Sequence, residues 1–177
     1  MEAVTRPIDA FSAVELCAFG DLEITYGDEP ALRIEAPQSV LDRLDTDVED
    51  GCLVLRIRPL GWFGHHGQVR YFATTPQPVR RIGLSGSGKV LLPATEVDDL
   101  SIRLSGSGDV NTQTVKASTV ELTIKGSGSI SLDGMETVRA EAAIYGSGKV
   151  IVQDGAATSL ELRIPGSGEL DFGAVRS

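Results

Sequence analysis

Residues 84–110 read LSGSGKVLLPATEVDDLSIRLSGSGDV, so the triplet Gly-Ser-Gly occurs twice in this stretch, twenty residues apart. The same triplet recurs three more times with no residue gained or lost between copies. A fixed period of this length is typical of a chain that coils and stacks on itself. The period predicts that residue i lies on residue i+20. The five triplets are Gly86-Ser87-Gly88, Gly106-Ser107-Gly108, Gly126-Ser127-Gly128, Gly146-Ser147-Gly148 and Gly166-Ser167-Gly168.

Apolar and polar residues alternate on both sides of each triplet. Leu100, Ile102 and Leu104 precede the second triplet, and Val110 and Thr112 follow it. This alternation predicts strands with one buried face, and the recurring glycine disfavours helix. Twenty residues per repeat suits one coil of a parallel β-helix, with neighbouring coils about 4.8 Å apart. We therefore expect an all-β solenoid with Gly-Ser-Gly at one corner of each coil.

The glycines are best explained by backbone geometry. A sharp corner often needs a positive φ, and stacked corners also bring backbones close together; glycine suits both. A phosphate-binding loop would instead need a following helix and usually a lysine, whereas a strand follows each triplet here. The coil that contains Ala140 and Ala142 should have a thinner core, unless Met135 or Tyr145 fills the space.

The first half lacks the triplet but remains rich in β pattern. We expect residues 1–177 to form one domain, with 1–78 as an irregular start and 79–177 as five regular coils. Asp50-Gly51 predicts a tight hairpin turn between two strands, and only Ser39–Arg43 suits a short helical turn. The predicted strands of the first half are Asp21–Tyr26, Ala31–Ala36, Leu44–Val48, Cys52–Arg58 and Val69–Ala73.

The charge and hydropathy of the chain limit its partners. Net charge is −9 over 177 residues, which disfavours nucleic acids and anionic membranes as partners. The chain has no apolar run long enough to span a membrane. Met1–Cys17 lacks the basic start and apolar centre of a signal peptide, which predicts a cytoplasmic location if the chain is the full-length protein.

Few residues suggest a reactive or metal-binding site, and we expect no cofactor and no metal. Cys17 and Cys52 are interpreted as two separate small residues, with a disulfide as the alternative. Adjacent His65 and His66 on a glycine-rich loop are more typical of an exposed turn than of a metal site. On the same loop, Trp62 and Phe63 either fold back onto the core or form an apolar contact patch for a ligand.

Stacking at i+20 also predicts columns of charge. Lys89 should lie beside Asp109, and Lys149 beside Glu169. A second column contains three carboxylates that repel one another unless arginines such as Arg139 and Arg163, or a cation, offset them. A solvated face is the simpler explanation, with a calcium or ligand site as the alternative. These candidate ligand-binding residues are Glu121, Glu141 and Glu161.

The chain resembles the bacterial head GIN domain family, described as "putative auto-transporter adhesins" of unknown function. The resemblance is carried by Ala10-Phe11-Ser12-Ala13-Val14, by Phe19-Gly20-Asp21-Leu22-Glu23-Ile24, by Val48-Glu49-Asp50-Gly51-Cys52-Leu53-Val54-Leu55 and by the serial triplets. It covers about residues 8–172. It implies a right-handed parallel β-helix and a location in the cell envelope or outside the cell. It offers no catalytic residues to transfer.

Three functions remain open. The first is a non-catalytic envelope or surface binding module, adhesin-like, with a glycan or protein ligand. The second is a self-assembling scaffold, since the last coil at Leu170–Ser177 leaves an open edge that predicts a small homo-oligomer. The third is a carbohydrate-active β-helix enzyme, but coils of uniform length provide no long loops to wall a catalytic groove. We therefore expect no enzymatic activity.

Overall fold

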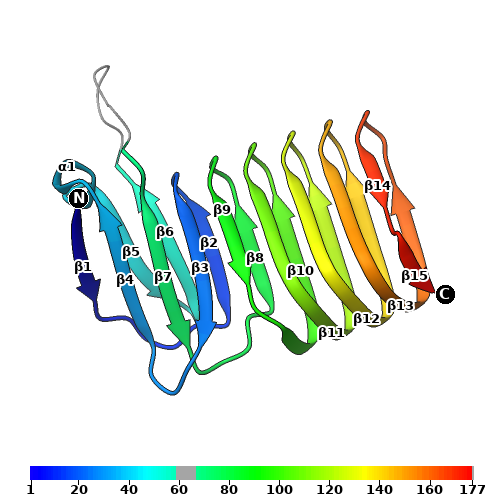
Figure 1. The fold of residues 1–177 in the computed structure, drawn as a ribbon, viewed down its shortest axis with the longest axis horizontal. Helices are drawn as coiled ribbons and strands as arrows, with labels where there is room; N and C mark the ends of the chain where they lie inside the picture. Colours follow the sequence, from blue (N-terminus) through cyan, green and yellow to red (C-terminus); the bar gives the residue numbers. More distant parts are fainter. Residues whose placement is uncertain (59–66, 177) are drawn as a thin grey trace.

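The computed structural model describes residues 1–58 and 67–176 of the chain. These residues form an all-β solenoid whose coils follow one another along the long axis of the molecule (Figure 1). The predictions for Trp62, Phe63, His65 and His66 lie outside the described residues. Among the described residues, no helix is long and apolar enough to cross a membrane.

The second half is the regular solenoid that the period predicts. Its strands pair in parallel, and every pair joins residue i to residue i+20, as in Val110 with Ile130 and Leu122 with Ala142. The same register continues through every later coil. The strands are β8 (Arg81–Leu84), β9 (Lys89–Leu92), β10 (Thr95–Leu104), β11 (Asp109–Ile124), β12 (Ser129–Ile144), β13 (Lys149–Arg163), β14 (Glu169–Asp171) and β15 (Ala174–Arg176).

The core consists of apolar columns that run along the axis. The column before the corners and the column after them are fully buried through four coils, and each such side chain contributes about 1.5–3 kcal/mol. In the coil of Ala140 and Ala142, Met135 is completely buried whereas Tyr145 is 54% exposed. Of the two candidates for filling that coil, only Met135 belongs to the core. The two columns are Leu84, Leu104, Ile124, Ile144 and Val90, Val110, Ile130, Val150.

The corner glycines serve close packing and not a left-handed backbone, which corrects one of the two explanations offered above. Among the described glycines only Gly20, Gly51 and Gly155 have positive φ. The backbone at the corners therefore has a conformation that any residue can adopt. A Cβ on Gly126 would instead overlap the carbonyl oxygen of Gly106, and one on Gly128 would overlap that of Gly108. Backbone stacked directly on backbone leaves no space for a side chain.

The first half closely follows the predicted strands. Asp50 and Gly51 both have positive φ, as the tight turn of the β5–β6 hairpin requires. The predicted helical turn is α1 (Gln38–Leu41). Two further strands, β1 and β2, were not among those predicted. The strands are β1 (Glu2–Arg6), β2 (Ala13–Cys17), β3 (Asp21–Tyr26), β4 (Ala31–Ala36), β5 (Leu44–Glu49), β6 (Cys52–Ile57) and β7 (Arg70–Thr75).

The coils of the first half are stacked in an order that differs from their order in the chain. Strand β2 pairs in parallel with β8 on one side and with β6 on the other. Strand β3 likewise lies between β9 and β7. The axial order is therefore β6–β7, β2–β3, β8–β9, which the reader can follow in Figure 1. The chain forms the β2–β3 coil first and then the β6–β7 coil on the outer side of it. It then passes back along β2–β3 to begin the regular repeat at β8.

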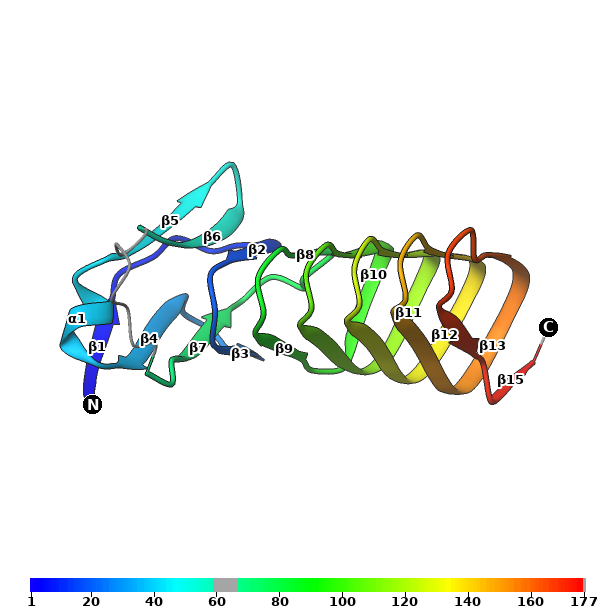
Figure 2. The same cartoon turned by 90° about the horizontal axis from the view of Figure 1, so that it is seen from above.

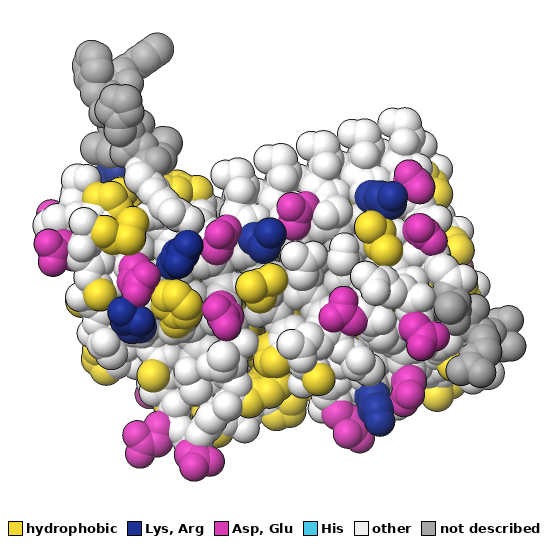
Figure 3. All heavy atoms as spheres, viewed as in Figure 1, with side chains coloured by type: hydrophobic (Ala, Val, Ile, Leu, Met, Phe, Trp, Pro, Cys, Tyr) yellow, Lys and Arg dark blue, Asp and Glu magenta, His cyan; other side chains and the backbone are white. Residues whose placement is uncertain are grey.

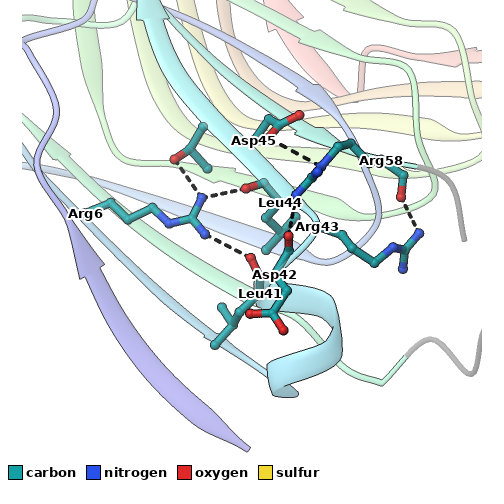
Figure 4. Close-up of polar contacts among 8 residues, drawn as sticks. Arg6, Leu41, Asp42, Arg43, Leu44, Asp45 and Arg58 are labelled. Carbon is teal, nitrogen blue, oxygen red and sulfur yellow. Dashed lines mark hydrogen bonds and ion pairs between the residues drawn. The ribbon is translucent and has the colours of Figure 1, made fainter.

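The N-terminal end is closed by β1, α1 and the β5–β6 hairpin, and the turn between β5 and β6 projects from the solenoid in Figure 2. Arg6 on β1 links β1 to α1 and β5 through side-chain hydrogen bonds. Its guanidinium donates to the carbonyl oxygens of Leu44 at 2.7 Å and Leu41 at 3.0 Å, and to the Thr46 hydroxyl at 3.1 Å (Figure 4). Two of these bonds satisfy the carbonyl groups of Leu41, the last residue of α1, and of Leu44, the first residue of β5.

One broad face carries charges that alternate in sign from coil to coil. We call it the post-corner face: the outward side of residues 89–92, 109–112, 129–132, 149–152 and 169–171, together with that of β3, β7 and β4. Lys149 and Glu169 form an ion pair at 3.4 Å, and the Ser129 hydroxyl donates to Asp109 at 2.7 Å. Blue and magenta side chains alternate along this row in Figure 3. In axial order the row reads Glu35, Arg70, Asp21, Lys89, Asp109, Ser129, Lys149, Glu169.

Candidate functional site

The predicted column of glutamates lies on the opposite broad face. We call it the pre-corner face: the outward side of residues 81–85, 101–105, 121–125, 141–145 and 161–165. Glu121 pairs in register with Glu141, and Glu141 with Glu161, so the three carboxylates stack along the axis. Ser101 continues the column on the N-terminal side.

Arginines from the neighbouring rows offset the stacked carboxylates. Arg139 contacts Glu141 and lies 3.8 Å from Glu161, while Arg163 also contacts Glu161. The hydrogen bond and negative charge of Glu161 raise the pKa of Arg163. Arg103 reaches Glu121 at 3.9 Å. The column is thus a solvated ladder of ion pairs.

The ladder does not make a metal centre. Among the described residues, no group of three or more His, Cys, Asp or Glu side chains is arranged to hold a metal ion. Carboxylate oxygens that already accept guanidinium protons are poorly placed to bind calcium, which takes six to eight oxygen ligands.

A long hollow lies on the same face, toward the N-terminal side of the ladder. Its volume is about 1110 Å³. Gly83 lines it beside Glu15, and a Cβ on Gly83 would lie 3.6 Å from Cγ of Glu15. A smaller hollow of about 180 Å³ adjoins it and shares Glu121, Thr123 and Tyr145 with it. The side chains that line the larger hollow include Glu15, Arg81, Ser85, Ser101, Arg103, Ser105, Glu121, Thr123, Lys125 and Tyr145.

Lys125 and Tyr145 are neighbours at the edge of this hollow. Each directly follows a residue of the paired strands, Ile124 and Ile144, which lie in register. Both side chains are exposed, and more than half of Tyr145 is open to solvent. An exposed phenol next to an ammonium group offers an apolar platform beside a positive charge.

A hollow of similar size, about 1140 Å³, lies where the coils return from the post-corner to the pre-corner face. Its charged lining is mainly acidic: Glu96, Asp98, Asp99 and Glu136 against Arg80 and Lys116. Lys116 already pairs with Glu136 at 3.6 Å. This hollow contains no aromatic side chain among its lining residues.

The two cysteines are separate and unbonded, as the sequence suggested. Burial raises the pKa of the Cys52 thiol, while a hydrogen bond with Arg81 opposes the shift. Sequence reasoning placed the glutamates together correctly but missed Lys125, Tyr145 and Arg103. The i+20 column Ser85, Ser105, Lys125, Tyr145, Pro165 could have revealed the first two, because it lies outside the apolar columns.

Comparison with solved structures confirms the fold. A structure described as a "putative lipid binding protein" from Parabacteroides distasonis superposes with a TM-score of 0.65 at 18% identity, covering 99% of this chain and 96% of that one. A "putative adhesin" from Bacteroides fragilis gives 0.62 at 19% identity, covering 99% and 97%. One from Parabacteroides merdae gives 0.62 at 19% identity, covering 99% and 91%.

A comparison with curated proteins found no match. The family comparison matched residues 10–177, which includes the irregular first half as well as the regular coils. The resemblance noted in the sequence is therefore confirmed over nearly the whole chain. The protein belongs to the family described as "Putative auto-transporter adhesin, head GIN domain".

Proposed function

We propose that this protein is a non-catalytic, adhesin-like binding module of the bacterial cell surface, and that its ligand lies along the pre-corner face. The description of the family as an adhesin supports a surface role. The observation that carries the choice of face is the long hollow with Lys125 and the exposed Tyr145 at its edge. Ligand sites are typically concave, with aromatic side chains and a few placed polar groups.

The arrangement of carboxylates supports a non-catalytic role. A glycosidase needs one carboxyl group kept protonated by its surroundings and a second across the scissile bond. Here the side chains of Glu121, Glu141 and Glu161 are 44%, 37% and 41% exposed, stand in a single column, and contact arginines. None of the three side chains is buried among apolar groups.

The opposite face is a weaker candidate because its charges are already matched. The alternating row leaves few groups there without a neighbour of opposite sign or a hydrogen-bond partner. Leu91 is its exposed apolar residue, at 38%. It serves as a matched control position, since it is exposed but lies on the post-corner face.

Binding of the immobilised protein to an array of bacterial and host glycans, and to whole bacterial cells, tests the proposal. We expect Tyr145→Ala to abolish binding and Leu91→Ala to preserve it, with circular dichroism confirming that both variants fold. Binding that survives Tyr145→Ala but not Leu91→Ala would move the site to the other face. Turnover of a glycan by the wild-type protein would contradict the non-catalytic assignment.

Self-assembly is a second candidate function, favoured by the last described coil. Leu162 and Ile164 stand in core columns that are buried in every earlier coil, yet they are 43% and 41% exposed. We expect the 177-residue chain to form a small homo-oligomer through this end. Light scattering should show a larger particle that Leu162→Lys reduces to a monomer and Leu91→Lys leaves intact. A monomeric wild type at high concentration would refute this candidate.

A further inference from the structure

We propose that the hollow of the pre-corner face binds an acidic glycan, a linear chain of uronic acid sugars, with Lys125 and Tyr145 as its principal contacts. This inference rests on the proposed function and names its ligand class. Three features of the described residues support it: the charge of the hollow, the aromatic platform, and the hydroxyl groups of its floor.

The hollow has a small excess of basic side chains, unlike the protein as a whole. Its lining contains Arg81, Arg103 and Lys125 against Glu15 and Glu121, whereas the chain as a whole has 25 acidic and 16 basic residues. Among the described residues, the ion pairs on this face use Arg103, Arg139 and Arg163 but do not include Lys125. The ammonium group of Lys125 is therefore available for a carboxylate from a ligand.

The lining has two acidic side chains. Glu121 pairs with Arg103 at 3.9 Å, and Glu15 is distant from Lys125. Glu15 pairs in register with Gly83, Gly83 with Arg103, and Arg103 with Thr123. Three strand spacings thus separate Glu15 from the coil of Lys125, or about 14 Å, which exceeds the screening length of physiological salt. Glu15 does not cancel the charge of Lys125 for a ligand at the Tyr145 end.

The aromatic platform selects a sugar over a simple anion. Tyr145 lies one coil beyond Lys125, so the two side chains start about 4.8 Å apart. A pyranose ring spans a similar length and has a C–H face that packs on an aromatic ring, as apolar groups do. A uronate unit over Tyr145 can therefore place its carboxylate beside the ammonium group of Lys125, where the two can form a charge-assisted hydrogen bond.

The floor suits the hydroxyl groups of such a chain. Ser85, Ser101, Ser105 and Thr123 line the hollow between the charged groups. Each side-chain hydroxyl can both donate and accept, as a sugar hydroxyl does. Ser85, the pair Ser101 and Ser105, and Thr123 belong to three successive coils, so an extended ligand along the solenoid axis would meet hydroxyl groups on each of these three.

Calorimetry with two forms of one glycan tests the proposal: oligogalacturonate, and the same oligomer with its carboxylates methyl-esterified. We expect the free acid to bind about tenfold more tightly, the effect of one charge-assisted hydrogen bond, and its binding to weaken with salt. Lys125→Gln should remove that preference while leaving ester binding unchanged. Tyr145→Ala should weaken both forms. Lys89→Gln, on the post-corner face, is the matched control and should alter neither.

The outcomes separate this inference from the proposed function. Equal, Tyr145-dependent binding of acid and ester would overturn the acidic-glycan assignment and leave the binding face in place. Failure of the wild type to bind oligogalacturonate, or binding to anionic phospholipid vesicles alone, would also overturn it. If no glycan on the array depends on Tyr145, both the inference and the proposed face are wrong.

Discussion

Gly126 lies directly on Gly106, so close that a Cβ on Gly126 would overlap the Gly106 carbonyl oxygen. The same relationship joins Gly146 to Gly126 and Gly166 to Gly146. Because none of these residues has positive φ, the sequence requirement comes from the coil below and not from the local backbone. The triplet repeats because each corner must accept the next one.

Gly126→Ala should therefore destabilise the protein strongly although alanine suits the backbone conformation. The added methyl group meets backbone, which cannot rotate away, so we expect a loss of about 2–3 kcal/mol or more, as for severe overpacking. The exposed side chain of the adjacent Ser127 makes Ser127→Ala the control, with an effect within about 0.5 kcal/mol. Urea denaturation compares them; equal midpoints would refute the packing explanation.

Gly51→Ala tests the opposite case. Gly51 has a φ of 76°, but a Cβ there would lie 3.9 Å from the nearest side-chain atom, Oγ of Ser12. The cost is therefore backbone strain without a clash, about 1 kcal/mol. We expect thermal denaturation to show a smaller loss than for Gly126→Ala. A larger loss would mean that the hairpin turn contributes more to the solenoid than its contacts indicate.

Val110→Asp should prevent folding, whereas Asn111→Asp should be tolerated. The side chain of Val110 is completely buried between Val90 and Ile130 in the core column, so an aspartate there would bury an unpaired charge. Asn111 is the next residue and faces outward, which makes it a control for charge. Soluble expression and circular dichroism distinguish the two; a folded Val110→Asp variant would contradict the column assignment.

The regular half of the fold was predictable because the period converts sequence distance into contact. Val110, Ile130 and Val150 follow one another at the repeat length, and this spacing is enough to place them in one column. The order of the early coils could not be predicted in this way. Val14 pairs with Leu53 and with Ile82, at separations of 39 and 68 residues, neither of which matches the repeat length. Without a repeat, alternation locates strands but does not identify their partners.

The candidate site was predictable only in part, for a related reason. The column of Glu121, Glu141 and Glu161 follows from the period alone. Lys125 is available to a ligand because the glutamates of this face pair with arginines and not with Lys125. Which cation each glutamate contacts is set by side-chain conformations, which the period does not predict. Tyr145 was ambiguous because an aromatic residue suits both a core and a surface, and only the burial of Met135 shows which residue fills that coil.

Arg139→Gln should have a small effect that depends on salt. The substitution removes the guanidinium that lies against Glu141 and near Glu161, leaving stacked carboxylates to repel. Since these side chains are exposed, we expect a loss of no more than about 1 kcal/mol at low ionic strength. The loss should shrink as salt screens the repulsion. Urea denaturation at low and high salt measures it; a loss unaffected by salt would point to packing.

Tyr71 should make the protein sensitive to alkaline pH. Its side chain is completely buried, and its hydroxyl donates to the carbonyl oxygen of Phe19 at 3.1 Å. Burial raises the pKa of Tyr71 above its usual value of 10.0, and the charge of Arg6 offsets a part of the shift. The folded state therefore holds the proton at pH values where the unfolded chain releases it. The stabilisation is complete below pH 10 and is lost as pH rises further.

Tyr71→Phe isolates this effect, because phenylalanine keeps the ring but does not ionise. At neutral pH the variant should lose about 1 kcal/mol with the hydrogen bond. Above pH 10 the wild type should lose up to about 1.4 kcal/mol per pH unit more than the variant. Tyr145→Phe, at an exposed ring, should instead follow the wild type across the whole range. Urea denaturation from neutral to alkaline pH gives the three curves; parallel curves for wild type and Tyr71→Phe would show that Tyr71 ionises in the folded protein as readily as in the unfolded chain.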